Sequence, residues 1–173
     1  NGKEVDVSCV YNADEGEIGF KFPTGYSSEY AVVIDPVLLA STLSGTTIGD
    51  NFRHHSTGDP NGHIYVCTQS FSPLGYPITP GVVQEVYNFD EAAPEYGVSK
   101  FSPDGSELIF STFLGGSGED RPLSIVTNSQ GELIILGSSA STNFPITDNA
   151  VQSENAGLFD LCLSKLSSDG TEL

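Results

Sequence analysis

Four short sequence landmarks occur twice in this chain, in the same order, and this internal repeat constrains the fold more than any single motif. Tyr-Pro-Ile-Thr at 76–79, for example, returns as Phe-Pro-Ile-Thr at 144–147. The four pairs of segments are 41–45 with 111–116, 59–66 with 128–135, 76–84 with 144–152, and 97–108 with 160–173. Because four landmarks recur in one order, chance is a poor explanation, and a fold of repeated units is indicated.

The repeats divide the chain into three parts. Residues 1–35 precede them and are expected to form a small N-terminal β-meander, the end of a preceding β-rich domain. Repeat 1 covers 36–110 and repeat 2 covers 111–173, and repeat 2 reaches Leu173 where a strand matching 107–114 is due. We therefore expect repeat 2 to be truncated and the sequence to be a fragment of a longer polypeptide.

Composition and turn signals predict an all-β fold. Short β-branched and apolar runs alternate with turns rich in the chain's 19 glycines and 10 prolines, and no window keeps a helical period. Within the N-terminal part, strands are expected at 4–10, 18–22 and 31–34, with a turn at 12–16. Strands of the repeats are expected near 107–114, 122–127, 132–137 and 158–166.

Four antiparallel strands per repeat is the strand content of a β-propeller blade. Asn61-Gly62 and Gln130-Gly131 supply tight turns between strands, since glycine readily adopts positive φ. The apolar run 133–136 lacks alternation, which indicates a strand covered on both faces. We expect antiparallel four-stranded β-propeller-type blades that form an incomplete propeller; a β-sandwich is the alternative.

The second repeat resembles a known family. Residues 111–120, 144–147 and 165–171 are similar to the bacterial SBBP-type β-propeller repeat, and the resemblance extends over 34–173. The first copy departs from it at Ser44 and at 46–48, where the glycine-rich corner is lost. The resemblance implies a large secreted or surface-attached bacterial protein of a kind common in Bacteroidetes. Many such proteins leave the cell through the type IX secretion system.

The chain is strongly acidic, with a net charge of −17 from 23 acidic and 6 basic residues. Nucleic acid is therefore not an expected partner, because phosphate contacts require clustered lysine and arginine. No run approaches the ~20 apolar residues of a membrane span, so membrane insertion is not expected either. The acidity fits a solvated surface; divalent-cation binding or repulsion from an anionic cell envelope is the functional alternative.

We expect the protein not to be an enzyme, and we assign no catalytic, cofactor-binding or metal residues. The chain has no HExxH, GxSxG, P-loop or GxGxxG motif. His54, His55 and His63 are expected at the surface or in turns, and the first two are adjacent, so on a strand they point to opposite faces. Neighbouring carboxylates at 14–15, 90–91 and 119–120 do not by themselves make a glycosidase pair, which must face across about 5–9 Å.

Calcium is the one possible cofactor. Asp120 follows a glycine-rich loop and Asp50 holds the matching place, while Asp104 and Asp169 also recur. A carboxylate beside loop carbonyls is the oxygen-rich setting that calcium prefers. The alternative is that each aspartate accepts hydrogen bonds from its own turn.

The three cysteines, Cys9, Cys67 and Cys162, lie far apart in strand-like runs and form no CxxC metal pattern. Buried free thiols are expected, with a disulfide or a reactive thiol as alternatives. The aromatic–proline pairs Tyr76-Pro77 and Phe144-Pro145 are expected to pack between blades, with sugar stacking as the alternative.

The sequence thus predicts a non-catalytic, secreted or cell-surface scaffold for adhesion or ligand presentation. Its expected partners are further repeats of the same polypeptide or a partner protein that completes the fold, with secretion machinery or surface glycans as further partners. The alternative is a carbohydrate-binding module or polysaccharide-active enzyme component that uses the loop 85–96, with Tyr87, Phe89 and Tyr96 as the test residues.

Overall fold

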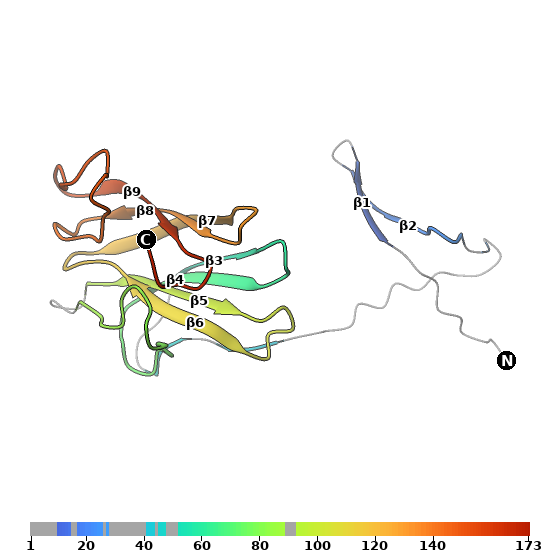
Figure 1. The fold of residues 1–173 in the computed structure, drawn as a ribbon, viewed down its shortest axis with the longest axis horizontal. Helices are drawn as coiled ribbons and strands as arrows, with labels where there is room; N and C mark the ends of the chain where they lie inside the picture. Colours follow the sequence, from blue (N-terminus) through green and yellow to red (C-terminus); the bar gives the residue numbers. More distant parts are fainter. Residues whose placement is uncertain are drawn as a thin grey trace. The chain divides into compact units, whose positions relative to one another are not determined.

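The computed structural model describes residues 10–14, 17–25, 27, 41–43, 45–47, 52–88 and 93–173. The chain separates into two compact units, Asn1–Val37 and Leu38–Leu173 (Figure 1). Every regular element in the described residues is a β-strand, which confirms the all-β prediction. Accordingly, that part of the chain contains no helix long and apolar enough to cross a membrane.

The first unit contains a β-hairpin. Strand β1 (Val10–Asp14) pairs antiparallel with β2 (Glu17–Lys21), so the strand predicted at 18–22 is confirmed. The turn predicted at 12–16 is wrong for its first three residues, because 12–14 pair with 17–19. Cross-strand pairing outweighs the local turn preference of Asn and Asp there. Most of the strand predicted at 4–10, and all of that at 31–34, lie outside the described residues.

The second unit contains two antiparallel sheets in which every strand lies beside its neighbour in sequence. The first sheet consists of β3 (Phe52–Gly58), β4 (Ile64–Ser70), β5 (Glu95–Phe101) and β6 (Leu108–Leu114). The second consists of β7 (Asp120–Thr127), β8 (Leu133–Ser139) and β9 (Asp160–Leu166). The strands predicted near 107–114, 122–127, 132–137 and 158–166 are confirmed. The described sheets, of four and three strands, do not close into a ring.

Two predicted glycine turns join the first two strands of each sheet, β3 to β4 and β7 to β8. Gly62 has a φ of 85° and Gly131 a φ of 76°, in the left-handed region that a side chain disfavours. The amide of Gly62 donates to the carbonyl of Asp59 at 2.9 Å, and that of Gly131 to the carbonyl of Asn128 at 3.0 Å. The two turns are therefore built alike, as the sequence repeat predicts.

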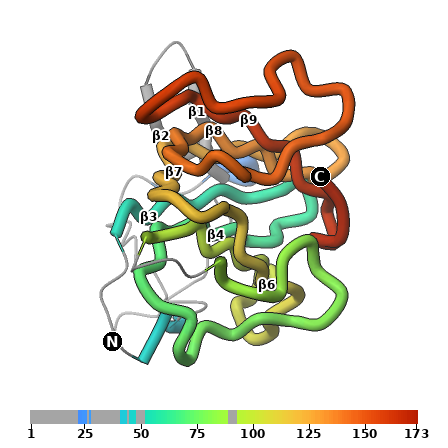
Figure 2. The backbone as a smooth tube through the Cα atoms, turned by 90° about the vertical axis from the view of Figure 1, so that its left-hand side faces the viewer, coloured from blue at the N-terminus to red at the C-terminus, as the bar shows by residue number. Residues whose placement is uncertain are grey.

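The two sheets pack face to face, and Figure 2 shows them as two stacked layers. The first sheet contributes Tyr65, Cys67, Tyr96, Val98, Phe110 and Leu114 to the shared core, and the second contributes Ile125, Leu133, Ile135 and Leu166. These side chains belong to strands from both repeats. The larger hydrophobic cluster of this unit therefore lies between the two sheets.

The other face of the second sheet is open. Leu133 and Ile135 of β8 are buried, but the next residue, Leu136, is 40% exposed. The prediction that 133–136 is covered on both faces is therefore wrong, because the first sheet covers one face only. On the neighbouring strand, Leu161 and Leu163 are 76% and 74% exposed.

Candidate functional site

Asp120, the residue considered for calcium, is a buried hydrogen-bond acceptor at the corner between the two sheets. Its Oδ2 atom accepts from the amide of Gly116 at 2.8 Å, and its Oδ1 atom accepts from the hydroxyl of Ser139 at 2.5 Å. The hydroxyl of Ser141 lies 3.0 and 3.1 Å from the two oxygens. These donors tie the corner after β6 to the end of β8. Only the bond from the Gly116 amide lies within the residue's own turn, as the alternative to calcium binding expects; the two serine donors come from another element.

The other aspartates of the calcium hypothesis do not join Asp120. Asp104 accepts from Ser102 and Ser106, and Asp169 accepts from Ser167 and Thr171, each within its own exposed turn. Asp50 lies outside the described residues. Across the described ranges, no group of three or more His, Cys, Asp or Glu side chains could hold a metal ion.

Glu95 lies beside Asp120, and both side chains are fully buried. A Cβ atom added to Gly115 would lie 2.5 Å from Asp120 Oδ2 and 2.8 Å from Glu95 Cγ, so only glycine fits between them. Burial raises the pKa of Glu95 to about 7, although hydrogen bonds from the Asn88 amide and the Gln84 side chain oppose the change. Burial also raises the pKa of Asp120, against the opposing bonds from Ser139, Gly116 and Ser141.

This pair has the perturbed acidity of many catalytic carboxylates, but it lacks access. Neither side chain exposes any surface, and their oxygens accept from neighbouring amides and side chains. The pair therefore serves the packing of the corner. Neighbouring Glu119 points elsewhere, to Arg121 at 2.7 Å and Gln69 at 3.1 Å. Residues 15 and 90–91 of the other carboxylate pairs are outside the described residues, and Asp14 lies in β1.

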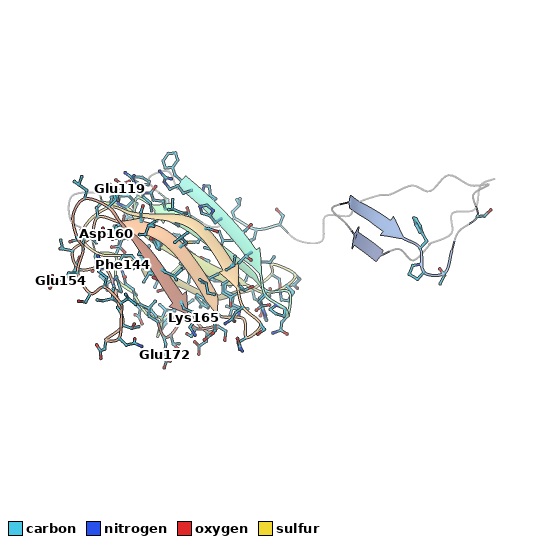
Figure 3. All side chains as sticks on the ribbon, turned by 90° about the horizontal axis from the view of Figure 1, so that it is seen from above. Glu119, Phe144, Glu154, Asp160, Lys165 and Glu172 are labelled. Atoms are coloured by element: carbon cyan, nitrogen blue, oxygen red, sulfur yellow. The ribbon has the colours of Figure 1, made fainter. Side chains whose placement is uncertain are left out.

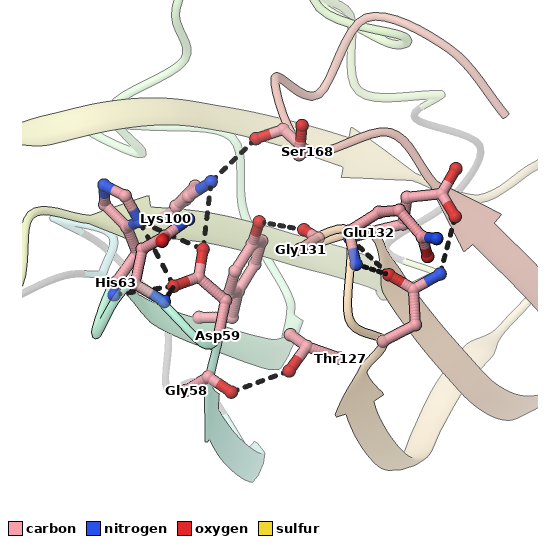
Figure 4. A network of polar contacts seen from close by, with 12 residues as sticks. Gly58, Asp59, His63, Lys100, Thr127, Gly131, Glu132 and Ser168 are labelled. Atoms are coloured by element: carbon pink, nitrogen blue, oxygen red, sulfur yellow. Dashed lines mark hydrogen bonds and ion pairs between the residues drawn. The ribbon is translucent and has the colours of Figure 1, made fainter.

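A polar network links the two sheets at their opposite end (Figure 4). Asp59 accepts from the His63 amide at 3.0 Å, and the His63 ring lies 3.0 Å from its Oδ2 atom. Lys100 lies 3.5 Å from the same carboxylate and donates to the carbonyl of Ser168 at 2.8 Å. Tyr65 donates to the carbonyl of Gly131 at 2.6 Å. Two of these bonds, from Lys100 and Tyr65, cross from the first sheet to turns of the second.

The charge of Asp59 is favoured in this network. Burial alone raises the pKa of its carboxyl, but the amides of His63 and Asn61 and the His63 ring outweigh burial, so the pKa lies below its usual value. His63 is thus a turn histidine, as predicted. His54 and His55 are in β3, where a register irregularity falls between Phe52 and His55.

Two cysteines are described, and both are free thiols, as expected. Cys67 is buried, and burial raises its pKa well above the usual range. Cys162 is half-buried in β9, with its Sγ atom 2.9 Å from the Tyr96 hydroxyl. Burial also raises the pKa of Cys162, so neither thiol has the lowered pKa of a reactive cysteine. Cys9 lies outside the described residues.

The aromatic residues considered for glycan binding are packed inside. Tyr96 is completely buried and Tyr87 is 6% exposed, so neither ring presents a face on which a sugar could stack. Phe89 lies outside the described residues. Phe144 packs against Tyr96 of the other sheet at 5.8 Å between ring centroids, in line with the packing expected between neighbouring repeats. Tyr76 instead packs against Phe113 within its own sheet, at 5.1 Å.

One surface feature, a groove, was not predicted from the sequence. A groove of about 600 Å³ lies between β9 and the loop that precedes it. Figure 3 shows Phe144, Glu154 and Asp160 at one end of the second sheet, with Lys165 toward the other end of β9. The groove adjoins the open face that carries Leu161 and Leu163. The sequence repeat could have indicated this groove. Positions of the first sheet that match its lining, such as Tyr96 and Val98, are buried, whereas Leu161 and Leu163 are exposed.

No protein-family model matches this chain, and a search of curated proteins finds no match.

Proposed function

We propose that this chain is a non-catalytic scaffold module of a secreted or cell-surface protein, built from propeller-type repeats that stack through their sheet faces. The SBBP-type resemblance and the acidic surface support an extracellular role in adhesion or ligand presentation. The single observation that carries the proposal is the open face of the second sheet. That face is the counterpart of the face that the first sheet buries in the core.

The repeat aligns each open position with a buried one. Val98 is completely buried, and its counterpart Leu163 is 74% exposed; Tyr96 is completely buried, and its counterpart Leu161 is 76% exposed. Leu161 and Leu163 are thus apolar at positions where they bury little surface within this unit. Exposed contiguous apolar patches commonly mark interaction surfaces.

Lysine positions follow the same relation. Lys100 is buried and reaches across to the Ser168 carbonyl of the second sheet. Its counterpart Lys165 has a side chain that is 57% exposed and pairs with Glu132 of its own sheet. The face around Lys165 therefore carries a lysine, as well as apolar side chains, at the positions that the first sheet uses to contact the second.

Stacking can be tested by appending a third copy of the repeat, with the sequence of 109–173, after Leu173. Leu163→Ser should cost less than about 0.5 kcal/mol in the present chain, because the side chain is exposed. In the extended chain it should cost about 1–2 kcal/mol, because the leucine becomes buried. Urea unfolding of both chains measures the difference. Val98→Ser, at the buried counterpart, should be destabilising in both.

Equal costs of Leu163→Ser in the two chains would contradict stacking. The extracellular location has its own test, which is antibody labelling of intact cells that make the protein. Labelling only after the cells are opened would contradict it.

A further inference from the structure

The groove beside β9 has a filled counterpart in the first sheet. There, β6 lies between β5 and the loop 76–88 and pairs with both. Ser111 exchanges hydrogen bonds with Thr79 at 3.0 Å, and the amide of Phe113 donates to the carbonyl of Gln84 at 3.1 Å. In the second sheet, β9 is the last strand of the described residues, and the groove occupies the place that β6 takes in the first.

The loop that lines the groove is already shaped to receive a strand. Gln152, the counterpart of Gln84, donates to Asp160 at 2.9 Å and to the carbonyl of Glu154 at 2.7 Å. Gln84 makes the same two bonds in the filled site, to Glu95 at 2.6 Å and to the carbonyl of Val86 at 3.0 Å. The hydrogen bonds that position the filled loop are therefore present in the open one.

Two of the three apolar residues that surround the filled site also have apolar counterparts in the groove. In the filled site Phe113 of β6 is 1% exposed, because Tyr76, Tyr87 and Ile78 surround it. Phe144 and Ile146 stand at the positions of Tyr76 and Ile78, and Ile146 is 50% exposed. The open groove thus offers an apolar binding site for one large side chain. Thr147 matches Thr79 beside it.

We propose that the groove binds an extended β-strand supplied by residues 39–45 of a second copy of this chain. This segment reads Leu-Ala-Ser-Thr-Leu-Ser-Gly and aligns with Ile-Phe-Ser-Thr-Phe-Leu-Gly at 109–115, the sequence that fills the first site. Leu43 takes the place of Phe113, and it is 99% exposed and outside any strand. A strand added to a sheet edge gains main-chain hydrogen bonds, while pockets for alternate side chains give specificity.

The donor segment and the acceptor groove are different surfaces, so the contact is head to tail. Such heterologous contacts produce rings or open chains, because each bound copy still offers one free surface. The inference rests on the scaffold function in using the same repeat relation. Leu161 and Leu163 of the open face also line the groove, whereas Ile146 lines it from the loop. The variant Ile146→Asp therefore separates strand binding from stacking through the open face.

Sedimentation velocity of the whole chain over a range of concentrations tests the proposal. The wild-type chain should form larger species as concentration rises. Leu43→Asp in the donor and Ile146→Asp in the groove should each stay monomeric, because a carboxylate cannot occupy an apolar binding site without a large desolvation cost. A mixture of the two variants retains one working donor and one working groove, and it should form 1:1 dimers that grow no further.

Leu74→Asp is the matched control for Ile146→Asp, since Leu74 is similarly exposed, at 53%, in the loop of the first repeat. It should associate like the wild type. A wild-type chain that stays monomeric, or a Leu43→Asp variant that associates normally, would overturn the proposal. Association that is lost in Leu163→Ser but kept in Ile146→Asp would also overturn it, while supporting stacking through the open face.

A labelled peptide with the sequence of 108–116 provides a second readout by fluorescence anisotropy. It should bind the wild-type chain at least tenfold more tightly than the Ile146→Asp variant, and a scrambled peptide should not bind. Thr147→Val should weaken binding, whereas Thr57→Val in β3 should not. Peptide binding by a chain that never self-associates would overturn the second copy as the source of the strand.

Discussion

At the scale of single residues, the most unusual chemistry is the burial of acidic side chains in a strongly acidic protein. Glu95 and Asp120 meet around Gly115, where no side chain larger than hydrogen fits. Their shifted acidity results from burial, and the groups that oppose the shift are the donors that hold the corner together. Perturbed pKa values at this corner therefore report a structural role.

The free energy of unfolding of the wild-type chain should fall between pH 5 and pH 8, and in the variant Glu95→Gln this fall should be smaller. Because the pKa of Glu95 is about 7 in the folded chain and 4.5 without burial, its contribution is fully present below about pH 4.5 and is lost as the pH rises through 7. The loss amounts to at most about 3.5 kcal/mol at pH 8, since each tenfold change in proton affinity is worth about 1.4 kcal/mol. Glutamine cannot ionise, so this part of the loss disappears.

Urea unfolding of both proteins at the two pH values measures this change. Glu107→Gln, at an exposed position, is the control and should keep the wild-type pH dependence. The same fall in stability for Glu95→Gln and the wild type would show that Glu95 is ionised at low cost.

At the scale of elements, the two sheets approach closely because one strand carries a glycine at the contact. Gly137 of β8 lies under the ring of Tyr96, whose hydroxyl contacts Cys162. The strand positions and turns were predictable, because glycine turns and short apolar runs are local signals. The contact was not predictable, since it depends on which faces of two distant strands meet.

Gly137→Ala should destabilise the second unit by about 1–3 kcal/mol, which is the usual cost of overpacking. The added methyl group would collide with the Tyr96 ring and with the carbonyl of Arg121, a backbone atom that cannot move aside cheaply. Gly58→Ala is the matched control, because a Cβ there meets only the His63 carbonyl at 3.7 Å. Thermal and urea unfolding compare the two variants, and an equal effect would contradict close packing at Gly137.

At the scale of the whole molecule, charge and repeat architecture act in opposite directions. The net charge of −17 destabilises the folded chain, because its acidic groups repel one another. The repeat relation, in contrast, leaves an apolar face and a strand groove that favour association. A chain with this combination should depend on ionic strength both for folding and for assembly.

Raising NaCl from about 0.1 to 1 M should increase the free energy of unfolding by roughly 1 kcal/mol, because the screening length falls from about 10 Å to about 3 Å. The measurement is urea unfolding at pH 7. The control is the same salt series near the isoelectric point of about pH 4.1, where little net charge remains to be screened. A salt effect of equal size at both pH values would assign it to the salt's action on apolar surface.

The sequence alone determined the class of fold, most strand positions in the repeats and the turns at Gly62 and Gly131, because these depend on side chains close together in the chain. It also determined that these two turns are built alike. It did not reveal which faces are covered: the run 133–136 reads as fully buried, yet Leu136 is exposed.

Only the tertiary structure decided the roles of Asp120, Tyr96 and the edge of β9. Whether an aspartate binds an ion or serine hydroxyls, and whether an aromatic ring stacks on a sugar or on another sheet, depends on groups far away in the sequence. Burial depends on which two surfaces pack together. A sequence pattern predicts it only where a repeat allows a buried position to be compared with an exposed one.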